Sequence, residues 1–281
     1  MVFSQLHVLR FVNGVIMKFE KIGFIGCGKM AGAIIKGIIK SGFISSDNVL
    51  ASKSNPDNLK ETSKQLGVKI TLDNKEVAEF GDIIFIGVKP NQVKTVLEEI
   101  KGTVTQYKLI VSMAAGVNIS QIESFLTKAK VFRIMPNTPI LVNEGMTGVC
   151  VGSLPDGNDL EQILSIFNSI GKAIVVDENQ MDIVTAISGS GPAFFYKVMN
   201  DIARAGEKLG MDYEKALMLS IQTALGSAKM ALNRQISMEE LISNVATKGG
   251  CTFEGIQKMS DSERFFFEVI KTTAEKARKL G

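Results

Sequence analysis

Two glycine-rich stretches contain the residues whose types and spacing best suit chemistry on an anionic ligand. The first reads GCGKMA, from Gly26 to Ala31, and joins the apolar run KIGFI to the amphipathic run AIIKGIIK. The pattern G-x-G-x-x-(G/A) between a strand and a helix is typical of a dinucleotide-binding turn. Gly26 permits a tight turn, Gly28 lets a pyrophosphate approach the backbone, and Ala31 allows close helix–strand packing. We therefore expect a dinucleotide here; a glycine-rich turn without a ligand is the alternative.

The end of the next expected strand, VLASKSN, indicates which dinucleotide binds. An NAD site usually has an acidic residue at this place, and this segment has none. Ser52 and Lys53 can instead bond and neutralise a 2′-phosphate. We expect NADPH to be preferred, with NADH as a weaker alternative. Lys53 as a solvated surface lysine is the competing interpretation.

The second stretch, ATKGGCTFEG from Ala246 to Gly255, feeds a helix for which Thr252 is a candidate N-cap. Its backbone N–H groups could hold a substrate carboxylate. A tight turn between two helices is the alternative. Further small or rigid loops end other expected strands at Gly87–Pro90, Ser112–Gly116 and Arg133–Pro139. Such loops suit the nicotinamide–ribose arm of a cofactor, although Pro90 also fits the first position of a helix.

Composition narrows the class of protein. The chain has 281 residues, of which 45% are hydrophobic, and a net charge of +3, so neither a nucleic-acid partner nor a polybasic membrane contact is expected. Apolar runs stay below the ~18 residues that cross a bilayer. Cys27, Cys150 and Cys251 are widely spaced without a CxxC pair, which favours a reducing, cytoplasmic location and no cysteine-based metal site. Oxidation at Cys27 or Cys251 is conceivable because helix N-termini lower thiol pKa values, but packing roles are favoured.

Residues 1–16 precede a second methionine, Met17, and contain the single histidine, His7. This leader has one arginine and no small-residue cleavage site, so we interpret it as a peripheral N-terminal extension rather than a signal peptide. The remaining chain then has no imidazole for base catalysis or for a metal, and we expect no metal site.

The order of elements predicts the fold class. From Lys18 to Val176, β-branched runs alternate with amphipathic segments, which predicts an α/β, Rossmann-type, doubly wound and mostly parallel sheet over residues 17–177. The expected strands are EKIGFIG, NVLAS, VKIT, DIIFIGV, KLIVSM, KVFRIM, MTGVCVG and KAIVVD.

An all-α C-terminal domain is expected over residues 178–281, with helices at 192–209, 213–232, 238–245 and 262–279. Asp212 and Ser237 are plausible N-caps, and Gly210 fits a helix stop. The run ALMLSIQTALGSAKMAL is apolar on more than one face, which favours burial against a second subunit over burial on the first domain.

Several separated motifs together resemble one enzyme family. GFIGCGKMA, GVKP, AAG, RIMPNTP, SGSGPAF and KGGCTFEG stand in the order and approximate spacing of pyrroline-5-carboxylate reductases. The resemblance covers Lys18 to about Leu280. It implies NAD(P)H-dependent reduction of the C=N bond of 1-pyrroline-5-carboxylate to L-proline, the last step of proline biosynthesis, and a homo-oligomer that is at least a dimer through its helical domain.

The residue patterns and the resemblance together imply specific site residues. The expected cofactor residues are Ile25, Gly26, Cys27, Gly28, Lys29, Met30, Ser52, Lys53, Asn74, Gly87, Val88, Lys89, Pro90, Met113, Ala114 and Ala115. The expected substrate residues are Thr247, Gly249, Gly250, Cys251 and Thr252, with Thr252 as the catalytic residue near the ring nitrogen. Where the family usually reads Ser-Pro-Gly-Gly, this chain reads Thr247-Lys248-Gly249-Gly250, so the rigidity of the loop is in question.

Two other functions fit parts of the pattern. A β-hydroxyacid-dehydrogenase-like enzyme, or another imine reductase, would share the dinucleotide domain, and the former would use a lysine such as Lys197 as acid and base. A non-catalytic NADP(H)-binding protein would need only the first glycine turn.

Overall fold

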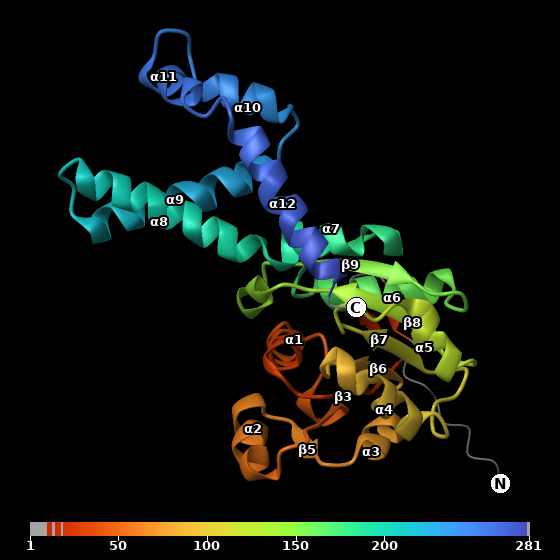
Figure 1. The fold of residues 1–281 in the computed structure, drawn as a ribbon. Coiled ribbons are helices and arrows are strands. Elements are labelled where there is room, and N and C mark those ends of the chain that lie inside the picture. Colours follow the sequence, from red (N-terminus) through yellow and green to blue (C-terminus); the bar gives the residue numbers. More distant parts are fainter. Residues whose placement is uncertain (1–9, 13–14, 18, 280–281) are drawn as a thin grey trace. The chain divides into compact units, whose positions relative to one another are not determined.

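The computed structural model describes residues 10–12, 15–17 and 19–279, and its chain divides into two compact units (Figure 1). The first unit contains the chain up to Gly189 together with the C-terminal end from Thr273, and the second contains Ser190–Thr272. Within the described residues, no helix combines the length and the apolar character needed to cross a bilayer.

An eight-stranded sheet forms the centre of the first unit, and all eight expected strands are confirmed. Its strands are β3 Ile22–Ile25, β4 Val49–Ser52, β5 Lys69–Thr71, β6 Ile83–Ile86, β7 Leu109–Ser112, β8 Lys130–Met135, β9 Gly145–Val151 and β10 Gly171–Val175. They lie in the order β10-β9-β8-β7-β6-β3-β4-β5, and only β8 and β9 pair antiparallel. The chain order reverses between β3 and β6, which is the switch point where Rossmann sheets bind their ligand.

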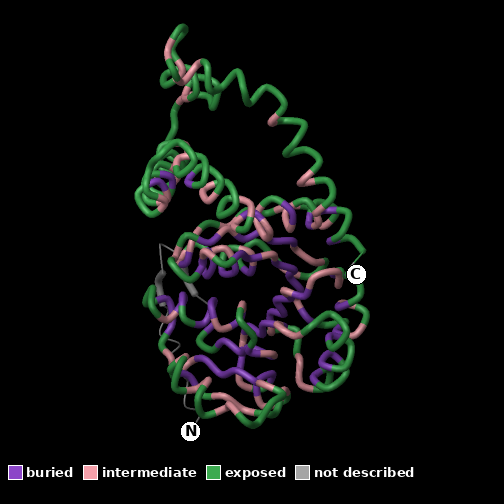
Figure 2. Tube along the Cα trace, turned by 60° about the vertical axis from the view of Figure 1, so that its left-hand side comes forward, coloured by how far each residue is buried: buried purple, intermediate pink, exposed green. Residues whose placement is uncertain are grey.

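Helices follow most strands and cover the sheet. They are α1 Lys29–Lys40, α2 Leu59–Leu66, α3 Asn74–Phe80, α4 Pro90–Ile100, α5 Ile119–Phe125 and α6 Gly157–Asn168. Short 3-10 turns lie at Ser46–Asn48, Pro56–Asn58, Thr138–Val142 and Glu178–Gln180. Strands β3, β4, β6 and β7 consist of buried residues along their whole length, and Figure 2 shows the buried stretches gathered inside the first unit. Ile22 and Phe24 enter one core cluster and Ile25 the other, because side chains alternate along a strand.

Part of the N-terminal extension pairs as a separate two-stranded sheet. Strands β1 Arg10–Val12 and β2 Val15–Met17 pair antiparallel, apart from the main sheet. The sequence pattern did not indicate these strands. The rest of the predicted extension, including His7, lies outside the described residues.

The second unit is helical, as predicted. It contains α8 Gly191–Lys208, α9 Tyr213–Leu232, α10 Met238–Val245, α11 Cys251–Gln257 and most of α12 Ser262–Arg278. Asp212 caps α9 and Ser237 caps α10, since each side chain accepts a backbone N–H, from Lys215 and from Glu240. Gly210 follows α8 with a φ of +98°, as expected for a helix stop.

The segment after Asp177 belongs to the first unit by its contacts. Helix α7 Met181–Val184 and the short π-helix Thr185–Gly189 lead from the sheet toward α8. Glu178 accepts hydrogen bonds from Arg133 at 3.1 Å and from the Ile119 amide at 2.8 Å. These bonds fix the segment to β8 and α5, so the compact units separate after Gly189, later than the boundary after Asp177 expected from the loss of strand pattern.

Candidate functional site

The first glycine turn has the backbone geometry that its sequence predicts. Gly26 has a φ of +89°, a conformation that side-chain-bearing residues rarely adopt. A Cβ on Gly26 would lie 2.9 Å from the carbonyl carbon of Gly87, so the turn after β3 and the turn after β6 approach closely. Gly28 is the N-cap of α1, where no side chain caps the helix and a Cβ would meet open space. The first amides of α1 can therefore receive an anionic group.

A cavity of about 660 Å³ lies over this turn at the carboxyl ends of the strands. Nine of the predicted cofactor residues line this cavity: Gly26, Cys27, Gly28, Ser52, Lys53, Asn74, Gly87, Val88 and Lys89. The lining also includes Ser54, Leu72, Asn91, Gln92, Thr95, Val96 and Glu99, which were not among the predicted residues. A cavity of this size at a switch point fits an extended dinucleotide.

A chain of hydrogen bonds crosses the side of this cavity formed by β4, α3 and α4. Asp73 caps α3 and so places Asn74 at the first position of that helix. The Ser52 hydroxyl donates to Asn74 Oδ1 at 2.6 Å, and Ser52 Oγ accepts the Gly26 amide at 3.3 Å. Asn74 Nδ2 donates to Glu99 Oε2 at 2.7 Å. The predicted residues Ser52 and Asn74 thus form one unit with Glu99, a residue that the sequence analysis missed.

Lys53 lines the same cavity and is half-buried. Its Nζ donates to Thr62 Oγ1 on α2 at 2.8 Å. The ammonium group of Lys53 therefore belongs to the cavity wall and is held against α2 in this structure.

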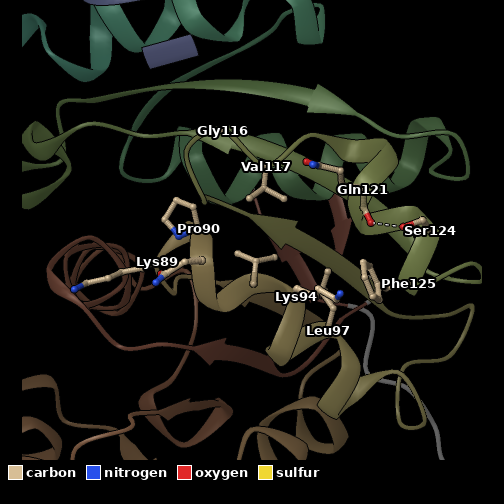
Figure 3. Close-up of a pocket in the computed structure, with 11 residues that line it drawn as sticks. Lys89, Pro90, Lys94, Leu97, Gly116, Val117, Gln121, Ser124 and Phe125 are labelled. Carbon is tan, nitrogen blue, oxygen red and sulfur yellow. Dashed lines mark hydrogen bonds between the residues drawn. The ribbon is translucent and has the colours of Figure 1, made fainter. Parts of the chain in front are cut away.

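The loops after β6 and β7 border a second cavity, of about 610 Å³, between α4 and α5 (Figure 3). Lys89 and Pro90 lie on one side of it, and Gly116 and Val117 lie across from them. The predicted residues Ile25, Lys29, Met30, Met113, Ala114 and Ala115 line neither cavity. Met113 follows β7 and donates its amide to Ile86 O at 3.1 Å, so its loop adjoins the end of β6.

The second glycine stretch forms a tight turn. The Gly250 amide donates to Thr247 O at 2.9 Å, and Gly249 has a φ of +80°. This combination is the signature of a type II turn, in which the third residue needs positive φ. Lys248 occupies the second position, where proline is common, and its side chain is exposed.

The expected N-cap role of Thr252 is wrong. Helix α11 begins at Cys251 with Gly250 as N-cap, and no side chain caps it. Thr252 is the second helical residue and half-buried, because the turn brings the chain into the helix two residues earlier than the N-cap propensity of threonine indicates. The amides of Cys251 and Thr252 consequently have no acceptor within the helix.

The packing role favoured for Cys27 agrees with its surroundings, and the less favoured alternative of an activated thiol does not. Burial raises the pKa of Cys27, and the nearby charge of Lys53 only partly opposes this. Burial also raises the pKa of Cys150 to about 11. Both thiols are buried, whereas the third, Cys251, is exposed, so the packing interpretation holds for Cys27.

Comparisons with known proteins agree with this geometry. The family model described as pyrroline-5-carboxylate reductase dimerisation matches residues 178–280, and the model described as NADP oxidoreductase coenzyme F420-dependent matches residues 21–116. Pyrroline-5-carboxylate reductase from Methanosarcina acetivorans is 37% identical over 268 residues, which cover 94% of this chain and 99% of that protein. The chain belongs to the pyrroline-5-carboxylate reductase family.

Solved structures of pyrroline-5-carboxylate reductases match the fold over most of the chain. The enzyme from Coxiella burnetii matches with a TM-score of 0.86 and 34% identity, covering 93% of this chain and 98% of that one. The pyrroline carboxylate reductase of Plasmodium falciparum, solved with NADP bound, matches with a TM-score of 0.81 and 31% identity over 93% of this chain and 98% of that one. This protein is thus a nicotinamide-dependent oxidoreductase with a helical dimerisation domain.

The surroundings of Lys197 disfavour one of the competing functions, that of a β-hydroxyacid dehydrogenase. Lys197, the lysine that a β-hydroxyacid dehydrogenase would use, pairs with Asp201 one helical turn away on α8, and its side chain is 71% exposed. It is an exposed partner in an ion pair rather than a buried acid and base.

The sequence contains a partial signal for Glu99. Gln92, Thr95 and Glu99 recur at helical spacing after Pro90, which places them on one side of α4. Asn91, Lys94 and Glu98 are also polar and exposed on this helix, so the spacing alone does not single out the side that lines the cavity.

Proposed function

We propose that this protein reduces the C=N bond of 1-pyrroline-5-carboxylate to L-proline, the last step of proline biosynthesis. The observation that carries the proposal is the presence of two separate backbone turns with uncapped amides. One turn lies at the switch point of a Rossmann sheet and the other opens α11. A diphosphate and a carboxylate are the anionic groups of the two reactants, and each turn matches one of them.

The residues of the first turn and its cavity would hold the cofactor. The Gly26–Met30 backbone would receive the diphosphate, and Ser52, Lys53 and Asn74 would surround the adenosine ribose. The Gly87–Pro90 and Met113–Ala115 loops would lie along the nicotinamide half. When bound, the cofactor supplies the hydride.

Residues 247–252 would hold the substrate. The amides of Cys251 and Thr252 would bind the carboxylate, while Thr247, Gly249 and Gly250 shape the turn that presents them. A protonated cyclic imine is already electrophilic, so the chain needs to orient the ring more than to activate it. The hydroxyl of Thr252 would hydrogen-bond the ring nitrogen, which keeps the ring in position or relays its proton.

A spectrophotometric assay tests this function. We expect loss of NADPH absorbance with 1-pyrroline-5-carboxylate and little loss with open-chain keto acids. With NADP⁺ in place of NADPH, we expect little gain of absorbance with 3-hydroxyisobutyrate or 6-phosphogluconate, because these hydroxy acids would have to donate the hydride. Cofactor binding without turnover of any imine would favour a non-catalytic role instead.

We also propose that NADPH is preferred over NADH, with Lys53 as the main attractive charge. A Lys53→Ala variant should raise the KM for NADPH about fivefold and leave the KM for NADH nearly unchanged, since one exposed ion pair contributes up to about 1 kcal/mol. Lys60→Ala, an exposed lysine on α2, is the matched control. A preference for NADH that Lys53→Ala does not alter would contradict the assignment.

The helical domain would join at least two copies of the chain. Location in the cytoplasm, and the absence of nucleic-acid, membrane and metal partners, remain predictions from the sequence.

A further inference from the structure

Glu99 brings a negative charge into the cofactor cavity from the last turn of α4. Its carboxylate accepts a hydrogen bond from Asn74 at 2.7 Å and lines the same cavity as Lys53. Neither glycine motif includes it, and the proposed mechanism gives it no part.

The carboxylate fixes the direction of the hydrogen bonds beside it. An ionised carboxylate can only accept, so Asn74 must turn its Nδ2 toward Glu99 and its Oδ1 toward Ser52. Ser52 then donates its single hydroxyl proton to that Oδ1, at 2.6 Å, and accepts the Gly26 amide with its oxygen. Ser52 is 1% exposed, whereas Asn74 is half-buried and Glu99 is exposed, so the chain of hydrogen bonds runs from the protein interior to the open side of the cavity.

This arrangement disfavours a phosphate beside Ser52. A phosphate oxygen needs hydrogen-bond donors, and the only proton of the Ser52 hydroxyl is already committed to Asn74. A 2′-phosphate also carries a charge of about −1.5 to −2 and would be repelled by the carboxylate in the same cavity. A 2′-hydroxyl is neutral and meets neither penalty.

We propose that Glu99 is a specificity-determining residue that, through Asn74 and Ser52, lowers the preference for a 2′-phosphorylated cofactor. Lys53 and Glu99 then act in opposite directions on the same group. The ratio of NADPH to NADH use reflects the balance between them. This inference rests on the proposed placement of the cofactor.

The test measures binding rather than turnover. Adenosine 2′,5′-bisphosphate and adenosine 5′-monophosphate are titrated calorimetrically into the full-length protein, and the ratio of their dissociation constants is compared between variants. Glu99→Gln should raise the preference for the bisphosphate about fivefold to tenfold, as removal of one partly exposed like charge predicts. The gain should shrink as salt rises, because exposed charges are screened.

Two variants serve as controls. Glu99→Asp keeps the charge and should stay close to the unaltered protein. Glu98→Gln removes an exposed charge from the adjacent position, outside the cavity lining, and should leave the ratio unchanged.

Each contrary result has a distinct meaning. A ratio that Glu99→Gln does not change, or that Glu98→Gln changes equally, overturns the role of Glu99 while the cofactor placement stands. Failure of both adenosine compounds to bind the unaltered protein overturns the placement as well.

Discussion

Single residues decide where the backbone can meet an anion. Gly26, with a φ of +89°, brings the turn after β3 within van der Waals range of the turn after β6, and this leaves the start of α1 open. Gly249, with a φ of +80°, allows the tight turn that precedes α11. At both places glycine supplies a positive φ that residues with a side chain rarely adopt.

Thr252 is the residue on which we expect turnover to depend most. Thr252→Ala should lower kcat/KM by roughly tenfold to a thousandfold, by analogy with the loss of one polar group in a buried site. Steady-state kinetics with 1-pyrroline-5-carboxylate measure the effect. Thr252→Ser keeps the hydroxyl and should retain most of the activity. An alanine variant with the kcat/KM of the unaltered protein would remove Thr252 from the mechanism.

At the scale of elements, the turn Thr247–Gly250 determines the position of α11. The turn is closed by one backbone hydrogen bond of 2.9 Å, and Lys248 stands where proline would preset the backbone. A lysine there leaves the unfolded chain more freedom, so the turn is less rigid than a proline would make it.

Substitutions in this turn should change stability in opposite directions. Lys248→Pro should raise the free energy of unfolding by about 0.4–1 kcal/mol, and Gly249→Ala should lower it by at least about 1 kcal/mol because its φ is positive. Urea titration measures both effects.

Gly255 provides the matched control, since it lies within α11 with open space at its Cβ position. Gly255→Ala should be neutral or stabilising, by up to about 1 kcal/mol. Destabilisation by Lys248→Pro would mean that the turn is not of type II.

At the scale of the whole molecule, the helical unit shows more apolar surface than a lone chain can shield. Met218 and Leu225 on α9 are 65% and 45% exposed, and Phe265 and Phe267 on α12 are each 62% exposed. Exposed apolar side chains in this number mark an interface with another chain. The match of the same region to a dimerisation model agrees with this interpretation.

Charges placed on this surface should weaken self-association. A Met218→Glu, Leu225→Glu double variant should shift the protein toward smaller species, because burial of each carboxylate is costly. Light scattering coupled to size exclusion measures the mass. Thr127→Glu, an exposed position in the first unit, should leave the mass unchanged. An unaltered mass in the double variant would place the interface elsewhere.

Sequence patterns alone determined the order of the eight strands of the main sheet and the positions of the two glycine turns. Strands buried on both faces, such as Ile83–Ile86, are apolar throughout, and positive-φ turns require glycine, so both features are local and readable. Caps such as Asp212 and Ser237 were equally readable, because each bonds an amide three residues away.

Only the tertiary structure decided how distant polar groups combine. Ser52, Asn74 and Glu99 are separated along the chain, and the parallel pairing of strands together with the path of α4 joins them into one hydrogen-bonded wall. The start of α11 at Cys251 and the raised thiol pKa of Cys27 likewise depend on burial and turn geometry. Burial and hydrogen-bond partners across long separations depend on how the whole chain packs, and no local pattern of residue types encodes them.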